Sequence, residues 1–167
     1  FCTEIGTCLE NLLAKQPDGT LALPLSSSPE IHNNSLRAWL KPNSNYDHDC
    51  MEALFLGLAD MAGSLRKPAE ATRWKNLAGT LHPRHIAGDH ILMFAEGEPF
   101  QESHRHHSHI MSIHPFGSLT IEQDDQARQT IKATLDKVDE LGTQAWTGYS
   151  FSWIASSFAR AGRAEDA

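Results

Sequence analysis

The chain has 167 residues, enough for one domain with its own core, and its 40% hydrophobic and 21% charged content is that of an ordinary globular protein. Its 21 acidic and 14 basic residues give a formal net charge of −7, which argues against nucleic acid or an anionic membrane as the main partner. No apolar run approaches the ~20 residues that a membrane-spanning helix needs.

The N-terminal third predicts one helix followed by loops. Apolar residues recur at intervals of three and four over 2–13, and turn-forming residues end this pattern. The expected inward stripe is Cys2, Ile5, Leu9, Leu12 and Leu13. We expect a short extended piece over 21–25 and a loop over 26–34.

Two further helices are predicted before the middle of the chain. Asp47 is the expected N-cap of a helix whose apolar stripe runs over 50–65. Pro68 fits the first turn of the next helix, over 69–81, with Trp74 on its inward side.

Residues 83–103 show no steady period, and a loop of that length in a compact domain is often functional. A short helix is expected over 110–113, a clear one over 123–141 ending at Gly142, and a last one over 150–161. No βαβ alternation or glycine-rich phosphate loop is present, so we expect an all-α array of antiparallel helix pairs.

Cysteine spacing gives little information about function. Cys2, Cys8 and Cys50 match no zinc-binding pattern, and we expect buried thiols rather than a disulfide.

Four imidazoles and one guanidinium lie within residues 103–109, the most unusual stretch of the chain. Groups that titrate near neutrality are costly to crowd together unless a polar cavity receives them. Two other runs stand out, the serine-rich residues 26–30 and the aromatic residues 146–153. We expect these three runs to meet as loops at one pocket on a helical scaffold.

The three runs resemble the catalytic domain of glycoside hydrolase family 95, the inverting α-L-fucosidases and their relatives. The matching pieces, in the family's order, are Ser28-Pro29-Glu30, Asp47, His104-Arg105-His106-His107-Ser108-His109, Thr147-Gly148-Tyr149-Ser150-Phe151-Ser152-Trp153 and Ala159-Arg160-Ala161-Gly162. Tyr149 stands where the family usually has Trp, and the usual Glu-Trp pair before the histidines is missing.

The resemblance implies a single partial domain over 1–167, the C-terminal part of an (α/α)₆ toroid that is incomplete and lacks the base-bearing segment. It implies cofactor-free hydrolysis of a terminal L-fucose on an oligosaccharide or glycoconjugate, a secreted or periplasmic location, and the remaining part of the toroid as a partner. Glu30 matches the family's proposed general acid. Because such an acid must hold a proton near neutral pH, we expect its carboxyl to be shielded.

Sugar contacts are expected from His104, Arg105, His106, His109, Trp146 and Gly148. Imidazole and guanidinium groups donate to hydroxyls, and a tryptophan stacks on a pyranose face. Gly148 permits close approach of the backbone to a ligand. Asp47 is expected to be a helix cap rather than a catalytic base, and Trp153 a core residue rather than a sugar platform.

Other interpretations stay open. One or two of the imidazoles could bond backbone carbonyls in the core. A zinc-dependent enzyme centred on His104, His106 and His109 is a weaker hypothesis, because no Cys or carboxylate lies at a usual metal spacing, and we expect no metal. A non-catalytic carbohydrate-binding or scaffold protein of the same fold is suggested by the missing base. A sibling specificity such as α-L-galactosidase is suggested by the departures from the family pattern.

The ends suggest a piece of a longer protein. The chain begins without Met, and another helix is expected to begin just where Ala167 ends it. Apolar helix faces without their partners predict that the isolated piece aggregates.

Overall fold

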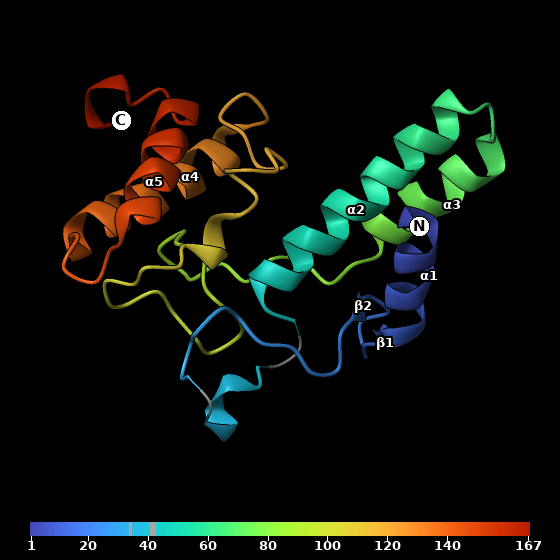
Figure 1. Cartoon of the computed structure of the whole chain (residues 1–167), viewed down its shortest axis with the longest axis horizontal. Helices are drawn as coiled ribbons and strands as arrows, with labels where there is room; N and C mark the ends of the chain where they lie inside the picture. The colour runs from blue at the N-terminus through green and yellow to red at the C-terminus, as the bar shows by residue number, and fades with distance from the viewer. Residues whose placement is uncertain (34, 41–42) are drawn as a thin grey trace.

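The computed structural model describes residues 1–33, 35–40 and 43–167, and helices are its main elements (Figure 1). The α-helices are α1 (Cys2–Leu12), α2 (Asn45–Ser64), α3 (Pro68–Gly79), α4 (Asp125–Leu141) and α5 (Gly148–Arg160). Three short 3₁₀ helices are η1 (Leu36–Ala38), η2 (Ser108–Ile110) and η3 (Ala164–Asp166). The described strands, β1 (Ala14–Lys15) and β2 (Leu21–Ala22), form a small antiparallel hairpin. The prediction of an all-α chain is therefore confirmed.

Two separate apolar clusters hold the fold, one at each end of the molecule. In Figure 1, α1, α2 and α3 gather at one end and α4 and α5 at the other, with long loops between them. The first cluster contains Met51, Phe55, Leu58, Ala59, Trp74, Leu77 and Leu81, and the Phe55 and Trp74 rings stack at 5.9 Å. α2 and α3 form the hairpin that the sequence predicts.

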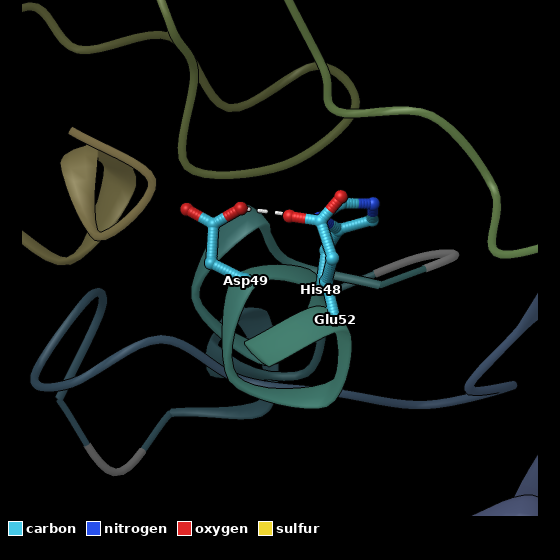
Figure 2. Close-up of side chains that lie close together, drawn as sticks. All are labelled: His48, Asp49 and Glu52. Carbon is cyan, nitrogen blue, oxygen red and sulfur yellow. Dashed lines mark hydrogen bonds and ion pairs between the residues drawn. The ribbon is translucent and has the colours of Figure 1, made fainter. Parts of the chain in front are cut away.

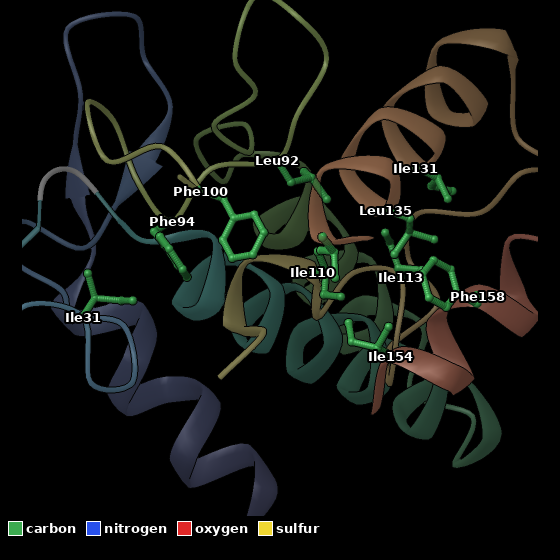
Figure 3. Packing of buried hydrophobic residues seen from close by; sticks show 11 residues of the cluster. Ile31, Leu92, Phe94, Phe100, Ile110, Ile113, Ile131, Leu135, Ile154 and Phe158 are labelled. Atoms are coloured by element: carbon green, nitrogen blue, oxygen red, sulfur yellow. The ribbon is translucent and has the colours of Figure 1, made fainter. Parts of the chain in front are cut away.

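The second cluster joins loop residues to the last two helices (Figure 3). Its buried members are Ile31, Leu92, Phe94, Phe100, Ile110, Ile113, Ile131, Leu135, Val138, Ile154 and Phe158. The loop residues come from both sides of the histidine-rich segment 103–109, so burial of this cluster fixes that segment in space.

Helix ends follow capping chemistry, with one correction. The Asp124 side chain accepts from the Ala127 N–H at 2.7 Å at the start of α4, and Gly142, with φ of 72°, ends that helix as predicted. Asp47 is not the N-cap of α2. That role belongs to Ser44, whose Oγ accepts from the Asp47 N–H at 3.1 Å. Both residue types cap well, and the helix begins two residues before Asp47.

Some of the predicted inward stripes are also wrong. In α1 the buried residue is Gly6, whereas Ile5 and Leu12 are exposed. Phe151, expected inside, is exposed at the start of α5. The expectation of buried thiols fails for two cysteines, because Cys2 and Cys8 are exposed on α1.

Loop predictions agree for residues 26–33, and residue 34 lies outside the described residues. Among the helices that the structure describes, none combines the length and the apolar character that crossing a bilayer requires.

Candidate active site

The serine-rich loop and the histidine-rich segment meet, as the sequence predicts. The Glu30 carboxylate forms an ion pair with the Arg105 guanidinium, and its Oε2 lies 3.1 Å from His106 Nε2. Beneath this contact, the buried hydroxyls of Ser28 and Ser108 lie 2.6 Å apart and share a hydrogen bond. The carboxyl, the guanidinium and the imidazole thus come together from residues separated by more than seventy positions.

The Glu30 loop has an unusual backbone. Glu30, His32 and Asn33 have φ values of 58°, 59° and 50°, the left-handed region that non-glycine residues seldom occupy. Such residues cost of order 1–3 kcal/mol each and persist where surrounding contacts over-determine them. Two hydrogen bonds from Ser44 hold the start of this loop in place. The Ser44 N–H donates to Ser26 Oγ at 2.7 Å, and the Ser44 Oγ donates to the Ser27 carbonyl at 2.9 Å.

The expected shielding of Glu30 is wrong for this structure. Its side chain is 44% exposed, and that of Arg105 is 47% exposed. The loop holds the carboxyl at the rim of a hollow rather than beneath the surface. The sequence pointed to Glu30 through the Ser28-Pro29-Glu30 motif. A motif of three residues does not specify which neighbours cover the glutamate side chain.

Three hollows surround this contact. The Trp39 hollow, of about 550 Å³, is lined by residues that include Ser27, Ser28, Glu30, Asn33, Ser35 and Trp39. The Glu98 hollow, of about 390 Å³, is lined by residues that include Glu30, His32, Arg37, Glu98, Glu102 and His104. The Tyr149 hollow, of about 320 Å³, is lined by Pro29, Tyr46, His106, His107, Ser108, Met111, Tyr149 and Trp153.

The His104 ring is held in place by the backbone of His106. His104 Nδ1 lies 3.0 Å from the His106 backbone nitrogen, whose N–H donates to it, and 3.2 Å from the His106 carbonyl oxygen, so both contacts hold the ring against its own loop. His104 lines the Glu98 hollow, where Glu98 Oε2 lies 2.8 Å from His32 Nε2. Because Nδ1 is engaged with the loop backbone, Nε2 is the ring nitrogen left for a ligand hydroxyl.

His109 does not take the predicted place in the pocket. It is fully buried and stacks on Phe100 with ring centroids 4.2 Å apart, while Phe94 approaches edge-on at 5.0 Å. Burial, followed by the charges of His107 and His104, lowers its pKa well below the ordinary value. His109 is therefore a core residue in this structure rather than a sugar contact. Its ring nitrogens have no hydrogen-bond partner among the described residues, so it does not make the bond to a backbone carbonyl that the alternative interpretation expects.

The start of α5 is tied to the histidine-rich segment. Ser150 Oγ accepts from the Thr147 N–H at 3.1 Å and donates to the Arg105 carbonyl at 2.8 Å. This double contact fixes the Arg105 backbone against the helix terminus. A hydrogen-bonded serine at the third helical position could have been suspected from the Thr-x-x-Ser spacing.

The sugar contacts of Trp146 and Gly148 stay predictions. Trp146 is partly buried, packs on the second cluster and meets the His107 ring edge-on at 5.0 Å. A Cβ added at Gly148 would meet no atom within 4 Å, so the protein's own packing does not require glycine there. Trp153, expected in the core, packs on that cluster and also lines the Tyr149 hollow.

Asp47 lies behind the Glu30 loop as a half-buried carboxyl. Burial raises its pKa, and hydrogen bonds with the Ser26 and Ser44 hydroxyls and the Ser27 backbone oppose that change. The contacts of Asp47 with this serine-rich loop were not expected from the sequence, nor was the lining of the Tyr149 hollow by Tyr46 and Met111.

A second polar cluster lies on α2, next to the loops (Figure 2). His48, Asp49 and Glu52 come close enough together to hold a metal ion, the one such group found among the described residues. The Arg84 guanidinium binds both carboxylates of this group, as a metal ion would. Its Nε donates to Asp49 Oδ1 at 2.6 Å, and it also forms an ion pair with Glu52. The cluster neutralises its carboxylates with an internal cation, so it serves the fold. The zinc hypothesis for His104, His106 and His109 finds no converging geometry within the part of the chain that the structure describes.

A helical chain that brings a glutamate, an arginine and an imidazole to the rim of several hollows suits the binding of hydroxyl-rich ligands. The family model described as the glycosyl hydrolase family 95 catalytic domain matches residues 3–167, so the chain belongs to this family. Alpha-L-fucosidase 2 of Arabidopsis thaliana is 29% identical over 162 residues, which cover 93% of this chain and 19% of that protein. The chain thus spans about a fifth of the length of this relative.

Proposed function

We propose that the chain carries the acid half of an inverting glycoside hydrolase that removes terminal L-fucose, with Glu30 as the general acid. The observation that carries this proposal is that Glu30, which lines the Trp39 and Glu98 hollows, contacts Arg105 and His106. Membership of the glycosyl hydrolase family supports hydrolysis as the activity and a carbohydrate as the substrate.

The proposed chemistry assigns separate tasks to the three groups. Glu30 protonates the oxygen that leaves with the aglycone, while a second carboxylate, roughly 6.5–9.5 Å away, activates the attacking water. In this proposal the second carboxylate belongs to the part of the toroid that this chain does not contain. Arg105 and His106 hold the Glu30 side chain in place before the substrate binds. In the complex they donate to substrate hydroxyls instead, which releases the carboxyl from the ion pair that keeps it ionised.

Glu30 must carry a proton when the substrate is bound, although it is half exposed in this structure. A substrate that fills the hollows expels water from around the carboxyl, and desolvation favours the protonated form. The remaining segments of the toroid are proposed to complete the cover, and a secreted or periplasmic location is proposed with them.

The test compares two substrates whose leaving groups differ in their need for a proton. In the full-length protein, Glu30→Gln should lower kcat on a fucosyl disaccharide by about 10²–10⁴-fold, with little change in KM. Activity on α-L-fucosyl fluoride should largely survive, because fluoride leaves without being protonated. An NMR spectrum of the first product from the wild-type protein should show the inverted anomer.

The matched control is Glu96→Gln, because Glu96 is an exposed glutamate that lines none of the three hollows. It should leave both rates unchanged. Cleavage of other α-glycosides without release from any α-L-fucoside would reject the fucose assignment, and faster release of L-galactose would favour that sibling specificity. Sugar binding without turnover in the wild-type protein would replace the proposal with a carbohydrate-binding role.

A further inference from the structure

The Tyr149 hollow has no role in the acid chemistry, yet it lies next to the acid. His106 connects the two: its Nε2 is 3.1 Å from Glu30 Oε2, and its ring lines the hollow. A ligand in this hollow would therefore lie one side chain away from the proton that Glu30 supplies. A volume of about 320 Å³ falls within the range of small-molecule sites.

The walls of the hollow suit the apolar face of a sugar ring. Tyr149 and Trp153 meet edge-on with ring centroids 5.2 Å apart, and Met111 and Pro29 also line the space. Tyr149 is 48% exposed, so part of its ring is open to a ligand. Aromatic side chains with a polar end offer both a stacking surface and a hydrogen-bonding group.

Polar groups without partners lie in the same walls. His107 is 1% exposed, and neither of its ring nitrogens has a hydrogen-bond partner among the described residues. The buried Nε1 of Trp153 also lacks one there. A buried unpaired group costs about 1–3 kcal/mol. These nitrogens are closed off from solvent, so the polar groups in the walls that a ligand can reach are the His106 ring, which is 29% exposed, and the hydroxyl of the half-exposed Tyr149.

We propose that the Tyr149 hollow binds the leaving-group sugar, a hexopyranose on the aglycone side of the bond that Glu30 protonates. This inference rests on the proposed function. A general acid must touch the oxygen that joins two sugars, so one sugar site is required on each side of it. The Trp39 hollow offers hydroxyl and amide groups from Ser27, Ser35 and Asn33, which suits selective recognition of the terminal sugar, whereas the half-open aromatic walls suit its more variable neighbour.

The test distinguishes the site of the leaving-group sugar from the site of the terminal sugar by using a substrate that has no leaving-group sugar. In the full-length protein, Tyr149→Ala should lower kcat/KM on a fucosyl disaccharide by about three- to tenfold, which is the usual worth of one aromatic contact. Activity on α-L-fucosyl fluoride should stay unchanged, because fluoride does not occupy the hollow. Tyr149→Phe keeps the ring and should retain most of the disaccharide activity.

Phe116→Ala is the matched control, since Phe116 is an exposed aromatic, 38% accessible, that does not line the hollow. Equal losses on both substrates, or no loss on either, would overturn the proposal. If the wild-type protein cleaves no α-L-fucoside, the proposed function fails and the hollow is tested by binding alone. Saturation-transfer NMR with methyl β-D-galactopyranoside and methyl β-D-glucopyranoside should then show contact that Tyr149→Ala removes, and its absence in the wild-type protein would overturn the inference.

Discussion

Acidification should destabilise the protein through His107. Burial, followed by the charges of His104 and His106, lowers the pKa of His107 from an ordinary value of 6.5 to about 4. Between these values the unfolded chain binds one more proton than the folded chain at this residue. The contribution to stability is therefore fully present above about pH 6.5 and is lost as the pH falls toward 4. The difference corresponds to roughly 3 kcal/mol of unfolding free energy.

The assay is urea unfolding at a series of pH values from 7 to 4, on the full-length protein and its His107→Phe variant. Phenylalanine keeps a flat ring for the edge-on contact with Trp146, at 5.0 Å in the structure, but does not titrate. The variant should lose roughly 3 kcal/mol less than the wild-type protein between pH 7 and pH 4. His109→Phe, made separately, should act in the same direction, because burial also lowers the pKa of His109. Parallel pH profiles for wild-type protein and both variants would refute the reasoning.

Two further predictions concern packing and a buried ion pair, both measured as shifts of the urea midpoint. Gly6→Ala places a Cβ 2.5 Å from Leu58 Cδ1 and should lower the free energy of unfolding by about 1–3 kcal/mol. A Cβ at Gly57, inside α2, meets no atom within 4 Å, so Gly57→Ala should raise the free energy of unfolding by about 0.5–1 kcal/mol. Equal midpoints for the two alanine variants would contradict this contrast. Asp49→Ala leaves the Arg84 guanidinium without the carboxylate that accepts its Nε–H at 2.6 Å, and should cost about 3–5 kcal/mol; an unchanged midpoint would contradict it.

Helix positions were predictable where the apolar period was long and its ends were chemically marked. α4 is the clearest case, because its stripe over Ala127 to Val138 and the following Gly142 agree with each other. α1 was harder. Its apolar residues form two neighbouring stripes, and the structure buries the side with Gly6, where the absence of a side chain leaves room for Trp74. Period alone does not distinguish two such faces, because the choice depends on the partner helices.

The candidate site was predictable as a meeting of segments but not in its details. The motif order placed Glu30 next to residues 104–109, and the structure agrees. The exposure of Glu30 depends on tertiary neighbours, which a tripeptide motif does not specify. Tyr46 was missed for a similar reason: it lies in the first turn of α2, and only the packing of the loop against that helix brings it to the Tyr149 hollow.

The histidine-rich segment performs two tasks because its side chains divide between two directions. The side chains of residues 104–106 are partly or largely exposed, with Arg105 and His106 on Glu30, whereas those of residues 107–109 are buried. The buried half joins the segment to the second apolar cluster, and Ser150 holds the Arg105 carbonyl from the other side. Because the two halves are adjacent in the chain, a change that loosens the buried half must also displace the guanidinium and imidazole next to the carboxyl. Loss of function from substitutions at residues 107–109 should therefore accompany loss of stability, whereas substitutions at residues 104–106 should separate the two.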